Sequence, residues 1–150
     1  MPERPVDENC IFCKIIAGTI PSADVYEDEE VCAFLDVSPI SRGHVLVVPR
    51  GHYRTLLDLP AGTSEALVSA MRIVAGALME QCGCGGFNCI SNNFSPAGQL
   101  VFHFHWHVVP RFDGDGLSVW PGGKYKDDAE MRQLAMSIKE RAASARRRSL

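Results

Sequence analysis

The sequence predicts an α+β fold, in which an antiparallel sheet of about five strands carries one long central helix and a C-terminal helix. Three observations lead to this fold class. Most predicted elements are short segments rich in β-branched and aromatic residues. The links between successive strand segments are short, which favours antiparallel pairing. Apolar residues recur at helical spacing in two longer stretches, one central and one C-terminal.

The first half of the chain is expected to hold one short helix, a strand end with a turn, and two strands after a polar, flexible arm. Gly18 and Pro21 stop the short helix, and Pro49 ends the second strand. In chain order, the arm covers 1–9, the helix covers 12–17, the strand end and turn cover 25–30, and the strands cover 31–37 and 44–48.

The second half is expected to mix helices and strands. The central helix carries Leu67, Met71 and Val74 at helical spacing, and Gly83 follows its end. In chain order, we predict a helix over 64–81, a strand over 87–90, a loop over 92–98, a strand over 100–109 that Pro110 ends, a Gly-rich loop over 113–123 and an amphipathic helix from 127 to about 146. The chain therefore divides into the arm, one domain at 10–125, and a C-terminal helix with a basic tail at 126–150.

Composition and charge narrow the class of protein. The 150 residues are 46% hydrophobic and 22% charged, which suits a single globular domain with a real core. Fifteen basic and eighteen acidic residues give a net charge of −3, so no nucleic-acid or membrane partner is expected. The N-terminus lacks the pattern of a secretory signal, and no apolar run reaches about 18 residues. We therefore expect a cytoplasmic protein whose six cysteines serve as thiols or metal ligands.

The most informative segment is Phe102-His-Phe-His-Trp-His-Val-Val. On a strand, His103, His105 and His107 would project from the same side, opposite an ordinary apolar face. Imidazole near neutral pH is suited to proton transfer, nucleophilic attack and metal binding. His103 and His107 would lie about 13 Å apart on an extended strand, too far to share one metal ion without strain. We therefore expect the three histidines to divide between roles.

A Cys-x-x-Cys motif at Cys10 and Cys13 leaves two interpretations open. A redox pair is possible, although the βαβ context of thioredoxin-like proteins is missing. A zinc site is the alternative, and it needs two more ligands from elsewhere in the chain. The other cysteines near the middle of the chain, Cys82, Cys84 and Cys89, are expected to be free structural thiols.

The histidine segment resembles the histidine triad signature of the HIT superfamily. Four further segments resemble the family in the right order, so that the likeness extends from about Cys10 to Arg111: Cys10-Ile-Phe-Cys, Phe34-Leu-Asp-Val-Ser-Pro, Gly43-His-Val-Leu-Val-Val-Pro and Ala97-Gly-Gln. The likeness is strongest to the Hint branch, particularly its bacterial zinc-containing members. It implies the HIT fold, a homodimer whose sheets join, and a nucleotide hydrolase or transferase that acts at the α-phosphate.

The resemblance also implies a role for each histidine near the phosphate. His105 would be the nucleophile and form a transient nucleotidyl-histidine, which requires a neutral ring with a free lone pair. His107 would contact the phosphate and assist the leaving group. His44, at the start of its own strand, matches a further active-site histidine of the family.

By the same resemblance, a purine nucleotide is the expected substrate. Asp36 would accept hydrogen bonds from the ribose hydroxyls. The phosphate site would include Asn92, Gly98 and Gln99, and an apolar slot for the base would include Phe12, Ile20, Phe34 and Val37. Leu100 departs from the pattern, because Hint-like relatives usually carry Ser or Thr there and leucine cannot donate a hydrogen bond to the reacting phosphate or the leaving group.

For the metal, the resemblance implies a structural zinc ion held by Cys10, Cys13, His52 and His103. Two thiolates and two imidazoles form a closed ligand set, which is typical of structural zinc. Such a site would fasten the N-terminal region to the histidine segment and steady His105 without taking part in the reaction.

Several functions remain open. Adenosine 5′-phosphoramidates are the first expected substrates, and dinucleoside polyphosphates, cleaved by hydrolysis or phosphorolysis, are a close alternative because of Leu100. A nucleotide-binding scaffold with vestigial activity is an alternative of another class. A zinc hydrolase with the metal at the reaction centre is a third.

Overall fold

The computed structural model describes residues 3–149, so Met1 and Pro2 of the predicted arm and Leu150 of the predicted tail lie outside the described residues. The chain divides into two units between Asp115 and Gly116. The first unit holds the sheet and the functional site. The second holds a linker and helix α3 (Asp128–Ser149), which buries none of its residues.

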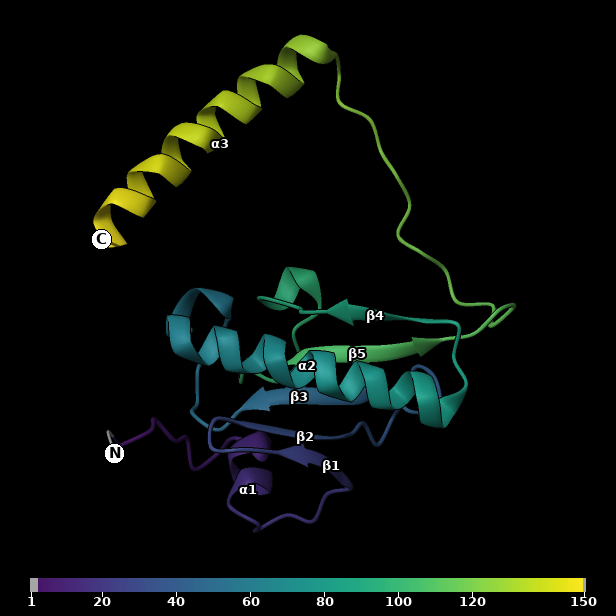
Figure 1. The fold of residues 1–150 in the computed structure, drawn as a ribbon. Helices are drawn as coiled ribbons and strands as arrows, with labels where there is room; N and C mark the ends of the chain where they lie inside the picture. The colour runs from purple at the N-terminus through teal and green to yellow at the C-terminus, as the bar shows by residue number, and fades with distance from the viewer. Residues whose placement is uncertain (1–2, 150) are drawn as a thin grey trace. The chain divides into compact units, whose positions relative to one another are not determined.

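Five antiparallel strands form the single sheet of the first unit, in the order β1-β2-β3-β5-β4 (Figure 1). The strands are β1 (Asp24–Glu27), β2 (Val31–Leu35), β3 (Val45–Pro49), β4 (Gly86–Ile90) and β5 (Trp106–Arg111). This arrangement confirms the predicted α+β class with a five-stranded antiparallel sheet.

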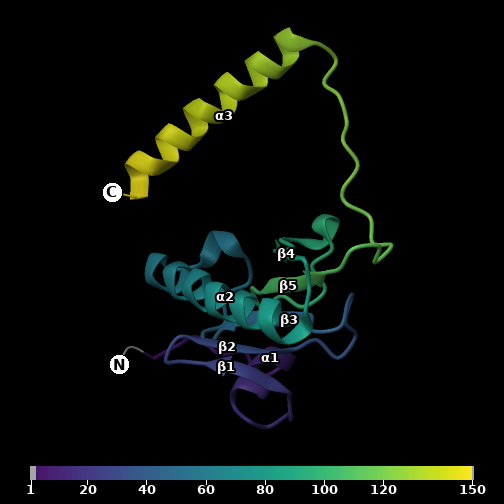
Figure 2. The same ribbon diagram turned by 45° about the vertical axis from the view of Figure 1, so that its right-hand side comes forward.

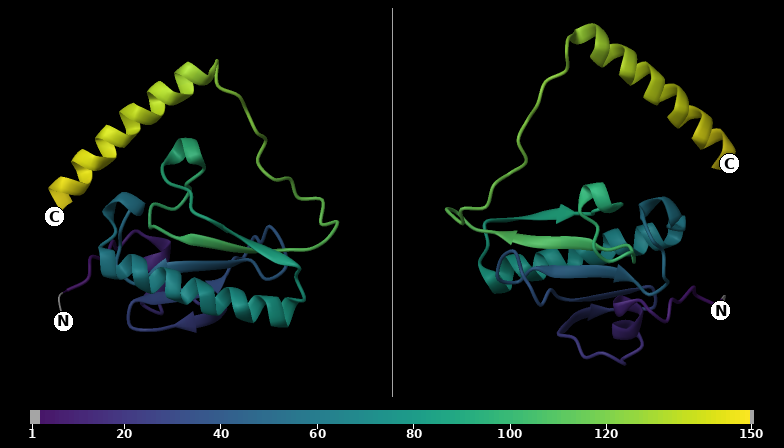
Figure 3. Two further views of the ribbon diagram at one scale, coloured as in Figure 1. Left: turned by 45° about the horizontal axis from the view of Figure 1, so that its top comes forward. Right: turned by 180° about the vertical axis from the view of Figure 1, so that it is seen from behind.

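Helix α2 (Ala61–Cys82) covers one face of the sheet, as the views from the front and from behind show (Figures 1 and 3). Leu67 and Val74 pack there against a layer of strand residues that includes Val31 and Val45. The helix begins three residues before the predicted Ser64, since Pro60 at its N-cap has the extended backbone that precedes a helix. Gly83 ends it with φ 65°, as glycine readily does at this position.

The opposite face of the sheet carries the short helix α1 (Ile11–Ile16), seen beside β1 and β2 in Figure 2. Alternation along β3 decides which residues reach each face: Val45 and Val47 join the layer under α2, whereas Leu46 and Val48 pack with Phe12 of α1. Two 3₁₀ turns, η1 (Leu56–Asp58) and η2 (Ser95–Ala97), complete this unit.

The predicted strand over 100–109 is wrong in its first half, because β5 begins only at Trp106 and runs through Pro110. Ladder pairing with β3 covers Trp106 to Val108 and ends at the pair Val47–Trp106. The carbonyl of Pro49 instead lies 2.8 Å from His103 Nε2. Pro110 is tolerated in the strand because it lies beyond the part of β5 that pairs with β3.

Within residues 3–149, no helix combines the length and the apolar character that a membrane span requires. The same residues contain no disulfide, and the six cysteines are free thiols. The predicted arm makes fixed contacts, since Pro5 accepts a 2.7 Å hydrogen bond from the backbone N–H of His52.

Candidate active site and metal cluster

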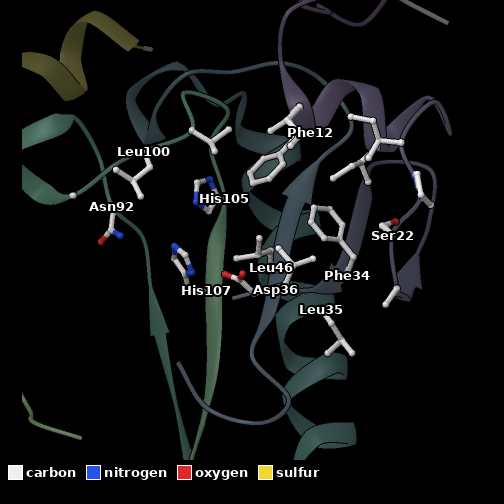
Figure 4. A pocket seen from close by; sticks show the side chains of 18 residues that line it. Phe12, Ser22, Phe34, Leu35, Asp36, Leu46, Asn92, Leu100, His105 and His107 are labelled. Atoms are coloured by element: carbon white, nitrogen blue, oxygen red, sulfur yellow. The ribbon is translucent and has the colours of Figure 1, made fainter. Parts of the chain in front are cut away.

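A pocket of about 540 Å³ opens on the face of the sheet opposite α2 (Figure 4). This volume lies in the range of small-molecule sites. The pocket brings together most of the predicted reaction and binding residues: Phe12, Ile20, Phe34, Asp36, Val37, Asn92, Gly98, His105 and His107. Two predicted residues do not line it: His44, which lies behind His107, and Gln99.

Aromatic rings form the apolar side of the pocket. Phe12 and Phe34 meet edge to face with ring centroids 5.6 Å apart, and Phe12 meets His105 at 5.0 Å and 90°. Phe12 and Phe34 are buried within the packing of α1 on the sheet, so these walls are rigid. The arrangement offers a fixed apolar slot next to an imidazole.

His105 is held in one tautomer by its own backbone neighbourhood. Its Nδ1 lies 2.7 Å from the carbonyl oxygen of His103, and only a protonated nitrogen can donate to a carbonyl. The proton therefore sits on Nδ1, and Nε2 keeps its lone pair. Burial lowers the pKa of His105 and so favours the neutral ring. A buried, neutral, oriented imidazole at a cavity wall is a competent nucleophile.

His44 and His107 form a short hydrogen-bonded series. The backbone N–H of Ile40 donates to His44 Nδ1 at 3.1 Å, so the neutral His44 ring carries its proton on Nε2. That nitrogen lies 2.9 Å from His107 Nδ1 and donates to it. Nε2 of His107 is then the protonated nitrogen, available to a ligand in the pocket. Burial, with the neighbouring His105 and His44, lowers the pKa of His107 to about 4.

Asp36 joins this group at the pocket wall. Its Oδ2 lies 3.7 Å from His44 Nε2, and its Oδ1 accepts a 2.8 Å hydrogen bond from the backbone of Ser38. The carboxylate therefore stands close enough to stabilise positive charge on the His44–His107 pair. It also lines the pocket, where it can accept hydrogen bonds from a ligand.

The buried side chain of Gln99 stabilises the loop before the histidine segment through hydrogen bonds to the backbone. Its side chain is 3% exposed, accepts from the N–H of Phe94 at 2.8 Å, and donates to the carbonyls of Arg54 and Val101. Both donor hydrogens are thus used within the protein. Gln99 does not line the pocket, so its contribution to a phosphate site stays a prediction.

The four residues predicted to bind metal converge on one point. The Sγ atoms of Cys10 and Cys13 and a ring nitrogen of His52 and His103 all lie within 4.8 Å of one another. The two Nδ1 atoms are 3.2 Å apart, and the sulfur–nitrogen distances are 3.5, 3.5 and 3.6 Å. Tetrahedral zinc with ordinary bond lengths would separate its ligands by about 3.3 Å for nitrogen pairs and about 3.6 Å for sulfur–nitrogen pairs. The donor set and its spacing therefore fit a metal ion.

His103 connects the metal cluster to the pocket. Its Nε2 donates to the carbonyl of Pro49 at 2.8 Å, which leaves Nδ1 as the unprotonated nitrogen that faces the two thiols. Its own carbonyl receives the Nδ1–H of His105. One residue thus serves the cluster through its side chain and orients His105 through its backbone.

The sequence alone missed several residues that line the pocket. Ile11 and Ile15 share the face of α1 that carries Phe12, and helical periodicity could have indicated them. Leu46 pairs in register with His107, a relation that only the strand pairing reveals. The carbonyl of Pro49 and the N–H of Ile40 form hydrogen bonds with His103 and His44, and no residue pattern predicts such backbone contacts.

Comparisons with known proteins identify the family and the fold. The family model described as "HIT domain" matches residues 17–114, more than half of the chain. The crystal structure of a Streptococcus mutans protein matches with a TM-score of 0.86 at 41% identity, over 91% of this chain and 87% of that one. The adenylylsulfatase HINT3 of Arabidopsis thaliana is 35% identical over 93% of this chain and 72% of its own length. A Zn-bound histidine triad family protein from Mycobacterium smegmatis matches at 36% identity and a TM-score of 0.71, over 91% of this chain and 97% of that one.

Proposed function

The chain belongs to the HIT family, and on that premise we propose that it cleaves purine nucleotides at the α-phosphate through a covalent nucleotidyl-histidine on His105. Adenosine 5′-phosphoramidates are the first proposed substrates, and dinucleoside polyphosphates are the second. The relative named as an adenylylsulfatase adds adenylyl sulfate to the substrates to be tested.

The hydrogen bond from His105 Nδ1 to the carbonyl of His103 is the observation that carries the proposal. It fixes the lone pair on Nε2 in a ring that lines the pocket. A free lone pair on a ring at the wall of a cavity is what nucleophilic attack requires. A nucleotide-binding scaffold does not require it, so this bond favours the enzyme over the scaffold.

The reaction follows from the two tautomers. The Nε2 lone pair of His105 attacks the α-phosphorus, and the bond from phosphorus to the leaving group breaks. The leaving nitrogen or oxygen takes the Nε2 proton of His107 from the protonated His44–His107 pair, whose positive charge the nearby Asp36 carboxylate stabilises, and the pair becomes neutral. Water then attacks phosphorus and gives a proton back to His107, the phosphorus–nitrogen bond breaks, and the nucleoside monophosphate leaves with His105 neutral again.

We propose that the nucleoside binds on the side of the pocket formed by the aromatic rings. The Phe12–Phe34 side would bury the purine, and Asp36 would accept from the ribose hydroxyls. Asn92 and Gly98 border the position of the phosphate, where glycine permits close approach of the backbone.

We also propose that Cys10, Cys13, His52 and His103 hold a structural zinc ion. The tetrahedral spacing of their donor atoms and the zinc-bound relative support this assignment. A closed set of four protein ligands leaves no position for substrate. The ion would therefore have a structural role, and the residues of the pocket would perform the reaction.

A homodimer through strand β4 is the proposed assembly. Among the described strands only β5 pairs with β4, which leaves one edge of β4 open for a second copy. Beside this edge, Val68, Met79 and Phe87 line an apolar groove and are partly exposed. A Phe87→Lys variant should be monomeric in analytical ultracentrifugation, whereas an unchanged mass would reject this interface.

The test of the proposed reaction compares the wild type with His105→Ala. Both proteins are incubated with adenosine 5′-phosphoramidate, adenylyl sulfate and a dinucleoside polyphosphate, and released nucleotide is quantified. The proposal expects turnover by the wild type, loss by at least about a thousand-fold in the variant, and retained nucleotide binding. Equal release by the two proteins would contradict it. Persisting activity in folded, zinc-stripped protein would exclude the alternative of a zinc-centred hydrolase.

A further inference from the structure

The side of the pocket that lies away from the Phe12–Phe34 slot is bordered by an exposed leucine. In Figure 4, Leu100 and Asn92 lie on one side of His105, while Phe12 and Phe34 lie on the other. The α-phosphate joins a nucleoside to a leaving group. If the nucleoside fills the aromatic side, the leaving group extends toward Leu100 and Asn92.

Leu100 is an apolar side chain presented almost fully to this space. It is 91% exposed, whereas leucine in a folded protein usually buries most of its surface. Of the two loop residues beside it, Asn92 offers a polar side chain, whereas Gly98 has no side chain. A ligand group placed here would contact an isobutyl group rather than a hydroxyl.

The backbone behind Leu100 is fixed. The preceding residue, Gln99, is buried and uses its side chain for three hydrogen bonds to the backbone of its surroundings. One of them holds Phe94, the non-glycine residue among 3–149 that has a positive φ, 71°. The backbone that carries Leu100 is thus held in place, so a ligand need not order the loop.

We propose that Leu100 is a specificity-determining residue, which makes this enzyme prefer leaving groups with an apolar substituent, such as alkylamines, over small polar ones. The inference rests on the proposed function and names the class of leaving group for the same site. Burial of alkyl groups against Leu100 would favour such substrates by about ten-fold in kcat/KM over polar groups of equal size.

The test uses three adenosine 5′-phosphoramidates that differ only in the amine: unsubstituted, N-propyl and N-(2-hydroxyethyl). The last two have the same number of heavy atoms and differ by one polar atom. The wild type is expected to favour N-propyl over N-(2-hydroxyethyl) by about ten-fold. Leu100→Ala removes the contact and Leu100→Asn replaces it with a polar group of similar size, so both should bring the ratio close to one.

Leu57→Asn is the matched control, since Leu57 is 81% exposed but lies outside the pocket. It should keep the wild-type ratio. Turnover by the Leu100 variants with an unchanged ratio would overturn the inference and leave the proposed function standing. The absence of turnover of all three substrates by the wild type would overturn the phosphoramidase activity and this inference with it.

Discussion

The two clusters of histidines lie on the same side of the sheet and differ in how their ring nitrogens are used. In the metal cluster, nitrogens of His52 and His103 point toward each other and toward two thiols, with the donor atoms all within 4.8 Å. In the pocket, His44 and His107 bond in series at 2.9 Å, and His105 bonds to a backbone carbonyl. In the first arrangement, which we call the closed cluster, the donor atoms of Cys10, Cys13, His52 and His103 all point to one position. In the second, which we call the open series, ring nitrogens of the histidines remain available to a ligand in the pocket.

The contrast shows that hydrogen-bond direction, rather than residue type, separates the two roles. A backbone carbonyl fixes the tautomer of His103 through Nε2 and that of His105 through Nδ1. The lone pair therefore lies on Nδ1 in His103, where it faces the thiols, and on Nε2 in His105, which lines the pocket. Two residues apart in the chain, the same side chain is thereby suited to a metal in one case and to nucleophilic attack in the other.

Breaking the closed cluster should have the largest effect on the whole protein. Cys13→Ser removes one of the four proposed zinc ligands, so we expect loss of bound zinc and a decrease of about 3–5 kcal/mol in the free energy of unfolding. Metal analysis and urea denaturation would measure both. Cys89→Ser is the control, because Cys89 is an exposed thiol outside the cluster. A Cys13→Ser protein that keeps both its zinc and its stability would refute the assignment.

Breaking the hydrogen bond between His44 and His107 in the open series should affect the reaction more than the stability of the fold. His44→Ala removes the donor that sets the tautomer of His107, so kcat for an alkylamine leaving group should fall by about a hundred-fold. A leaving group that departs without a proton, such as a nitrophenolate, should show a much smaller decrease. Equal losses for the two kinds of leaving group, measured in steady-state kinetics, would mean that His44 does not act through proton delivery.

Lowering the pH should have the smallest effect of the three, a gradual loss of stability as His107 becomes protonated. The pKa of His107 is lowered from 6.5 to about 4, chiefly by burial, so the unfolded chain binds the proton first. This contribution to stability is complete above pH 6.5 and is lost as the pH falls toward 4. The free energy of unfolding should therefore decline over this range, and His107→Gln should flatten the decline. An NMR titration midpoint near 6.5 for His107 would contradict the expected burial effect.

Much of the molecule could be predicted from its residues, and the failures have physical causes. The β-branched residues at 44–48, the helical spacing of Leu67 to Leu78 and the glycine at 83 were sufficient for this strand and the central helix. The histidine segment was expected to be a strand throughout, but its pairing with β3 ends at Trp106, and the backbone before Trp106 bonds elsewhere, as when Phe104 donates to Tyr53. Alternation alone could not reveal this, because it depends on how far the pairing with the neighbouring strand extends.

The candidate site was predictable by residue type but not by the direction of each bond. The convergence of Cys10, Cys13, His52 and His103 and the gathering of Asp36, His105 and His107 agree with the predicted groups. For Gln99 the phosphate role stays a prediction, and the three backbone partners of its side chain could not be foreseen from the sequence. The tautomers depend on the carbonyls of Pro49 and His103 and the N–H of Ile40, which the fold alone brings into range.

The central claim is that His105 Nε2 forms a bond to the α-phosphorus of a nucleotide. Mass spectrometry of the protein quenched during turnover of adenylate substrates tests it most directly, provided that the quench preserves the acid-labile phosphorus–nitrogen bond. We predict an added adenylyl group that maps to the peptide containing His105 and is absent from His105→Ala. Turnover without any adduct under conditions that trap such intermediates, or an adduct on another histidine, would contradict the claim.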